Sequence, residues 1–137
     1  MAAEITIENP TTLGTPLGQY SQMARVKNAV ETIYIAGMLA VDRAGKIVGE
    51  GDFAAQTDQV FANIAAALQS AGMAWGNVVQ FTTYLVDAAD IARFMDWRKR
   101  HFPTMFAQGQ YPPNTLLIVS RLVNPAFRIE VQTIAAR

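Results

Sequence analysis

Residues 112–136 decide the fold, and they read PPNTLLIVSRLVNPAFRIEVQTIAA. The four consecutive apolar residues at 116–119 predict a strand that is covered on both faces, because a strand with one face in water would alternate apolar and polar side chains. Asn124 and Pro125 form a turn pair, since proline restricts φ and asparagine tolerates the left-handed region. Beyond that turn, side chains alternate in character, which predicts a second strand.

This second strand carries a carboxylate among apolar residues. Its alternation places Ile129, Val131, Thr133 and Ala135 on one face, and Arg128, Glu130, Gln132 and Ile134 on the other. An ionised carboxylate in an apolar neighbourhood costs free energy unless it is hydrogen-bonded. Glu130 is therefore either paired with Arg128, Arg121 or a backbone donor, or it has a chemical role.

The bulk composition indicates one domain with some of its apolar surface buried between subunits. The chain has 137 residues, of which 51% are hydrophobic and only 16% are charged. So few charged residues leave little to cover a free surface. Eleven basic residues balance eleven acidic ones. A net charge of zero argues against a general binder of nucleic acid or anionic membranes, which needs clustered positive charge.

Residue usage also excludes several chemistries. The chain has no cysteine, which rules out disulfides, thiolate catalysis and cysteine-based zinc sites. A single histidine, His101, cannot form a histidine-based metal cluster. No apolar run approaches the roughly 20 residues that span a bilayer, and the acidic N-terminus lacks the apolar region of a signal peptide. We expect a soluble, cytoplasmic protein that does not associate with membranes.

Periodicity predicts strands and helices in a mixed order. Strands are expected around Ile5 and Ile7 and at residues 24–28, 29–36 and 78–86, and helices at residues 53–71 and 88–101. Asp52 is a suitable N-cap for the first helix, and Gly72 is suited to end it. Strands, helix, strand, helix and strands in this order predict an α+β fold. In it, a mixed sheet carries both helices on one face.

The second predicted helix has a buried side and a basic face. Asp87 is expected to cap it and Pro103 to stop it. Its buried side is expected to contain Ile91, Phe94, Met95 and Phe102. The basic run at residues 98–100 is typical of a solvated helix face.

Several motifs resemble the RidA/YjgF family. The C-terminal signature of that family is similar to Pro112-Pro113-Asn114-Thr115, Val119-Ser120-Arg121-Leu122 and Ile129-Glu130-Val131. Two earlier segments also resemble the family: Gly18-Gln19-Tyr20 stands where it usually has Gly-Pro-Tyr, and Ile35-Ala36-Gly37-Met38 stands where it usually has a Ser-Gly-Gln-like segment. The resemblance covers nearly the whole chain and implies a chorismate-mutase-like α+β fold. It also implies a homotrimer with a small-molecule ligand pocket in each of three intersubunit clefts.

The activity that the resemblance implies is hydrolysis of reactive imines or enamines, such as 2-iminopropanoate, to keto acids and ammonia. This reaction needs water activation and proton transfer and therefore no cofactor. In active deaminases of the family the signature begins Pro-Ala-Arg-Ser, and its arginine binds the substrate carboxylate; Asn114 occupies that position here. Loss of the charge-assisted pair would cost roughly 1.5–3 kcal/mol of binding. This change favours a neutral or amide-like ligand, as do Met95 and Ala36, which make the cleft less polar.

The resemblance assigns a role to each of six residues, and each also has a structural alternative. Glu130 would position water or transfer a proton. Asn114 is proposed to bind the ligand but could instead be a turn residue, and Tyr20 is placed at the cleft mouth but could instead pack on the core. Gly37 would be approached by the ligand or would form a bulge, and Tyr111 would belong to a specificity loop or would be exposed to solvent. Arg121 would be a displaced carboxylate clamp or would form a salt bridge across the strand ladder. Some relatives are named endoribonucleases and translation inhibitors. The zero net charge counts against that activity.

Overall fold

The strands and helices follow one another in the predicted order in the computed structural model, which describes residues 2–107 and 109–137. The bounds are β1 (Glu4–Glu8), β2 (Met23–Lys27), β3 (Thr32–Met38), α1 (Phe53–Ser70), β4 (Val78–Leu85), α2 (Asp90–Met105), β5 (Asn114–Ile118) and β6 (Ile129–Ala136). A short 3₁₀ turn, Trp75–Asn77, precedes β4. Every predicted element is therefore present, with shifts of a few residues at its ends.

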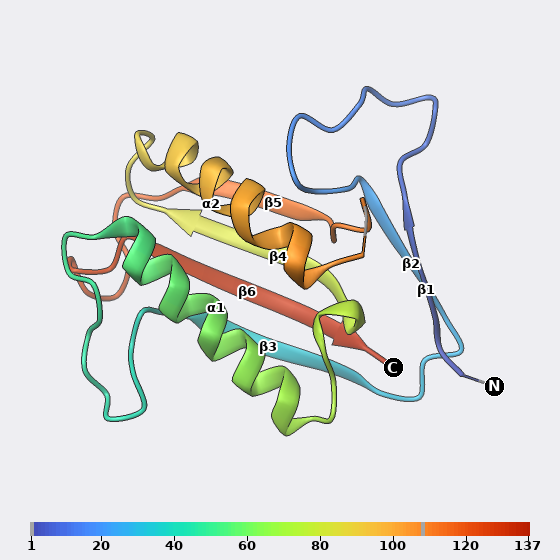
Figure 1. Ribbon diagram of the computed structural model, residues 1–137, viewed down its shortest axis with the longest axis horizontal. Helices are drawn as coiled ribbons and strands as arrows, with labels where there is room; N and C mark the ends of the chain where they lie inside the picture. The colour runs from blue at the N-terminus through green and yellow to red at the C-terminus, as the bar shows by residue number, and fades with distance from the viewer. Residues whose placement is uncertain (1, 108) are drawn as a thin grey trace.

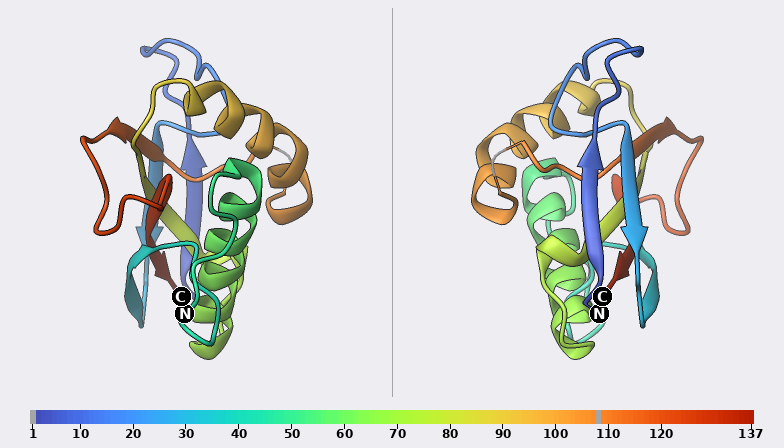
Figure 2. Two further views of the ribbon diagram at one scale, coloured as in Figure 1. Left: turned by 90° about the vertical axis from the view of Figure 1, so that its left-hand side faces the viewer. Right: turned by 90° about the vertical axis from the view of Figure 1, so that its right-hand side faces the viewer.

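The main sheet is mixed and carries both helices on one side. Its strand order is β3-β6-β4-β5; β6 runs antiparallel to both of its neighbours, and β4 runs parallel to β5. A parallel pair needs a crossover connection, which α2 provides. The strands β1 and β2 form a separate antiparallel pair. Figures 1 and 2 show α1 and α2 on the same side of the four-stranded sheet. The α+β fold class is confirmed.

The first helix begins and ends where its capping residues predict. The Asp52 carboxylate accepts a hydrogen bond from the Ala55 N–H at 3.0 Å, which satisfies one of the free donors of the first turn. Gly72 has a φ of +69° and donates to the Gln69 carbonyl at the other end. The side chains at the predicted 3.6-residue spacing lie in the core, namely Val60, Phe61, Ile64 and Leu68.

The second helix differs from the prediction at both ends. It begins at Asp90 instead of residue 88, because the Asp87 carboxylate accepts the Ala89 N–H in a turn that precedes the helix. It continues through Pro103 to Met105. The expected stop at Pro103 is wrong because the Phe106 N–H still donates to the Phe102 carbonyl across it at 2.9 Å. These two aromatic rings also pack 5.0 Å apart in the core.

The helix-facing side of the sheet forms the core. Along β6, the alternate residues Ile129, Val131, Thr133 and Ala135 are buried, as their spacing predicts. They pack with apolar side chains of both helices and with an aromatic cluster that includes Phe61, Phe81, Trp97 and Phe102. The side chains between them on β6, among them Glu130, therefore lie on the sheet face that neither helix covers.

The edge strand β5 is less covered than its apolar sequence predicts. Leu117 is 40% exposed and Ile118 is 45% exposed. The expectation that this strand is covered on both faces is therefore wrong for the single chain. Within the sheet the strand has only β4 as a neighbour, and the bridge of Ser21 with Pro113 lies just before its start. In the described residues, neither helix combines the length and the hydropathy of a membrane-spanning segment.

Candidate functional site

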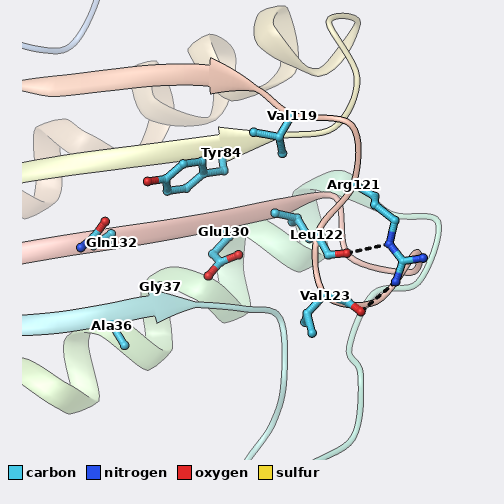
Figure 3. Close-up of a pocket in the computed structure, with 9 residues that line it drawn as sticks. All are labelled: Ala36, Gly37, Tyr84, Val119, Arg121, Leu122, Val123, Glu130 and Gln132. Atoms are coloured by element: carbon cyan, nitrogen blue, oxygen red, sulfur yellow. Dashed lines mark hydrogen bonds between the residues drawn. The ribbon is translucent and has the colours of Figure 1, made fainter.

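The helix-free face of the sheet has an open hollow around Glu130, with a volume of about 740 Å³. Strand register places Glu130 of β6 directly opposite Tyr84 of β4. The loop between β5 and β6 closes one end of the hollow, as Figure 3 shows. The lining residues are Ala36, Gly37, Tyr84, Val119, Arg121, Leu122, Val123, Glu130 and Gln132.

Gly37 allows the Glu130 side chain to lie against the backbone of β3. The pairing of β3 with β6 is irregular between Ile35 and Met38, so Gly37 lies in a bulge. A Cβ atom added to Gly37 would fall 2.0 Å from Oε1 of Glu130 and 2.7 Å from its Cδ. The bulge is therefore confirmed, while the approach of a ligand to Gly37 stays a prediction. Within the chain, the group that lies against Gly37 is the carboxylate of Glu130.

The Glu130 carboxylate has no partner among the described residues. Arg128, one candidate, donates to Asp90 from Nε at 3.1 Å and from Nη2 at 2.8 Å. Arg121, the other, donates to the backbone carbonyls of Leu122 and Val123 at 3.0 Å each (Figure 3). The suggested salt bridge of Arg121 in the sheet is therefore wrong. Partial burial raises the pKa of Glu130 because it disfavours the charged form.

Asn114 does not meet Glu130 within one chain. It pairs with Phe81, which belongs to the buried, helix-facing side of β4, so Asn114 shares that side. Its Oδ1 accepts a hydrogen bond from the Thr83 hydroxyl at 2.8 Å. Glu130 pairs with Tyr84 on the opposite face. The sheet thus separates two residues that the family resemblance assigns to one cleft.

Tyr20 and Tyr111 also lie away from the Glu130 hollow. Tyr20 is half-buried, and its hydroxyl accepts a hydrogen bond from the Leu17 N–H at 3.4 Å. Tyr111 is half-buried against the rings of Phe102 and Phe106, with centroids 6.0 and 6.3 Å away. Three of the six predicted site residues, Glu130, Gly37 and Arg121, therefore line one hollow, and the other three lie outside it.

Sequence reasoning missed two groups of the site. Strand periodicity placed Gln132 on the same face as Glu130, but the sequence assigned it no role in the site. Tyr84 comes from another strand and is placed by register alone. Two interpretations of α2 are also wrong. Met95 is 39% exposed, and Arg98, assigned to a solvated face, is only 4% exposed.

The fold and the motifs agree with known proteins. The family model "Endoribonuclease L-PSP" matches residues 11–137. The chain belongs to this family, the RidA/YjgF family. A RutC family protein of Pyrococcus horikoshii is 35% identical over 88% of each chain. A protein of Bos taurus named 2-iminobutanoate/2-iminopropanoate deaminase is 32% identical over 88% of this chain and 82% of its own.

A solved structure extends the agreement to the whole RidA/YjgF domain. The Rid-family protein YyfB of Yersinia pestis, described as a protein of unknown function, superimposes with a TM-score of 0.84 and 27% identity. The match covers 97% of this chain and 98% of that one. The chorismate-mutase-like arrangement expected from the sequence is therefore shown.

Proposed function

We propose that this RidA/YjgF-family protein hydrolyses reactive imine or enamine metabolites, with Glu130 as the acid/base group. The observation that carries the proposal is the geometry of Glu130. Its carboxylate has no partner among the described residues, has a raised pKa, and borders an open hollow. A carboxyl group whose pKa is raised toward neutrality is suited to proton transfer. The bovine relative is named as a deaminase of 2-imino acids.

The reaction consumes one water molecule and requires proton transfers both when the carbinolamine forms and when it breaks down. Glu130 in its protonated form donates to the imine nitrogen, and its carboxylate then accepts a proton from the water that attacks the carbon. Glu130, protonated again, then donates to the nitrogen of the neutral carbinolamine and accepts the hydroxyl proton as the C–N bond breaks, which releases ammonia and leaves a carbonyl product. Tyr84 and Gln132 line the same hollow and present polar atoms that can orient the water or the substrate.

We further propose that a homotrimer completes the cleft. Three observations support this arrangement. The helix-free sheet face exposes apolar side chains, including Tyr34 and Leu117. The charged fraction of the chain is low. Glu130 and Asn114 lie on opposite faces of one sheet, so a single binding site that uses both needs a neighbouring subunit. Sedimentation that shows only monomer at micromolar concentration would contradict the trimer.

A second candidate is a trimer that binds a small neutral metabolite without chemistry. Asn114 favours it, because this residue offers an amide where a cation would bind a substrate carboxylate, and its oxygen is already bonded to Thr83. The substitution Asn114→Arg discriminates between the two candidates. Activity that appears only in this variant would show that the scaffold is competent and that the native role is binding.

The direct test is ammonia release from freshly generated 2-iminopropanoate and from a neutral enamine. We expect the wild type to exceed the buffer rate and Glu130→Gln to lower kcat/KM by about 10²–10⁴-fold, the usual contribution of a general acid/base. Glu31→Gln, which alters an exposed carboxylate bound to Arg137, is the matched control and should retain the rate. Equal rates for wild type and buffer would exclude the hydrolase. Cleavage of RNA under the same conditions would favour the nuclease.

A further inference from the structure

Arg98, near the middle of α2, is buried without an anionic partner. It is 4% exposed, and its Nε and Nη1 atoms are fully buried. Among residues 2–107 and 109–137, no group accepts a hydrogen bond from its guanidinium. The ring of Phe94 contacts the charged group instead, with its centroid 4.5 Å from Cζ of Arg98. A cation–π contact offsets only part of the cost of removing a charge from water.

The surroundings of Arg98 include one of the predicted binding residues, Tyr20. Burial lowers the pKa of Arg98 to about 10, and the nearby Tyr20 phenol opposes that shift only in part. Tyr20 is followed by Ser21, which bridges to Pro113 next to Asn114. Asn114 accepts from Thr83 through its oxygen, which leaves its amide NH₂ as a donor. The segment around Tyr20 thus connects the guanidinium to the start of β5.

A hollow lies directly beside this guanidinium. It has a volume of about 350 Å³ and is formed by residues 17–19 and by the side of α2 that carries Ala92, Met95, Asp96 and Lys99. A Cβ atom at Gly18 would lie 3.8 Å from the Met95 methyl and 3.9 Å from Nη2 of Arg98. Gly18, which lines the hollow, therefore lies close to Nη2 of Arg98, and the flexible Met95 side chain lies beside the same contact.

We propose that Arg98 binds the carboxylate of a small monoanionic ligand that enters between residues 17–19 and α2. A planar guanidinium with free donors matches a planar carboxylate in shape and charge. One unpaired positive charge calls for one negative charge, because a dianion such as phosphate would keep an excess charge in a poorly hydrated place. Lys99 adds a further cation at the rim, while the Asp96 carboxylate there is held by Arg100 at 3.0 Å.

This inference deepens the proposed function and rests on it only in treating Tyr20 and Asn114 as binding residues. It changes the expected ligand, since the amide at position 114 alone favours a neutral one. The positive charge that binds the ligand would come from Arg98 of α2 and not from position 114 of β5. Binding can be measured without turnover, so the two proposals can fail separately.

The experiment is calorimetric titration of the full-length protein with pyruvate, pyruvamide and inorganic phosphate. We expect pyruvate to bind more tightly than the other two, and Arg98→Met to weaken pyruvate about 10–100-fold, as expected for loss of a charge-assisted hydrogen bond. Arg98→Lys should retain part of the affinity. Arg43→Met, which removes an exposed arginine from the turn before α1, should leave binding unchanged.

Several outcomes would overturn the proposal. Equal pyruvate affinity in wild type and Arg98→Met would do so, as would equal binding of pyruvate and pyruvamide. A loss of subunit association in Arg98→Met, at unchanged pyruvate affinity, would instead assign the guanidinium to a carboxylate of a second copy. Glu130→Gln separates the two proposals: it should bind pyruvate like the wild type while its rate of ammonia release falls toward that of the buffer. Circular dichroism of each variant verifies that the fold is retained.

Discussion

Two charged side chains of α2 are buried, and their surroundings are opposite. Asp90, at the start of the helix, has a fully buried side chain that is bonded to Arg93 at 2.8 Å and to Arg128 at 2.8 Å. The N-terminal position adds the favourable end of the helix dipole. Arg98, two turns further on, is almost as buried and has no acceptor among the described residues.

The difference shows that this fold can supply hydrogen-bonding partners to a buried charge, as it does for Asp90. Two arginines from different parts of the chain converge on Asp90, whereas no carboxylate of residues 2–107 and 109–137 bonds to Arg98. Glu130 resembles Arg98, since its carboxylate also lacks a partner in the described chain. Unpaired charges cost free energy, and we therefore infer that Arg98 and Glu130 find their partners in bound ligands.

The largest expected effect is the loss of stability when the paired carboxylate of Asp90 is removed. Asp90→Ala should lower the free energy of unfolding by about 3 kcal/mol, because removal of one partner leaves the others uncompensated. Chemical denaturation with urea measures it. A loss below about 1 kcal/mol would mean that Arg128 and Arg93 find water readily and that the contrast with Arg98 is weaker than the burial suggests.

The second prediction concerns the contact between Gly37 and the Glu130 carboxylate. Gly37→Ala places a methyl group where the carboxylate lies. The flexible glutamate can swing away, so we expect a stability loss of only about 1 kcal/mol but an activity loss of about 10²-fold from misplacement of the group. Thermal unfolding and ammonia release measure the two quantities. Gly76→Ala, at which an added Cβ meets no atom within 4 Å, is the control.

A smaller effect on stability, of opposite sign, is expected when the unpaired guanidinium of Arg98 is removed. Arg98→Met should raise the free energy of unfolding of the ligand-free protein by about 1 kcal/mol, because an apolar side chain of similar length replaces an uncompensated charge. Urea denaturation, in parallel with Asp90→Ala, tests this sign. A marked destabilisation would show that Arg98 already has a partner in the assembled protein.

The smallest effect is the pH dependence of Glu130. Its pKa in the folded protein is raised, so its protonated form is favoured by folding. The associated stability is present below the unfolded pKa, about 4.3 for glutamate, and is lost as the pH rises through the folded pKa. Glu130→Gln should therefore be more stable than the wild type at pH 7, and the difference should shrink at pH 4. A constant difference in melting temperature across this range would contradict the raised pKa.

The elements were largely predictable because their signals are local. The alternation in β6 and the capping residues of α1 each depend on neighbours within a few positions, and the structure confirms both. The errors arose where distant contacts override local rules. Pro103 lies inside α2 because Phe102 and Phe106 pack in the core, and Arg98 is buried because residues 17–20 cover that side of the helix.

The candidate site was predictable only in part. Glu130 and Gly37 were singled out from sequence, and the structure places one against the other. Tyr84 could not be assigned, because strand register links it to Glu130. The separation of Asn114 from Glu130 likewise depends on register, because Asn114 pairs with Phe81 and Glu130 pairs with Tyr84, on opposite faces of β4. The sequence alone does not show which strands pair, so it does not reveal which face each residue occupies.

The amino-acid sequence by itself determined the α+β class, the order of elements and the presence of an acidic residue on an apolar strand, because periodicity and capping operate over short distances. Only the tertiary structure decided which charges are paired. Asp90 meets Arg128 across 38 positions of the chain, while Arg98 and Glu130 meet no counter-charge in the described residues. The energy of a charge depends on its nearest neighbours in space, and these neighbours come from folding.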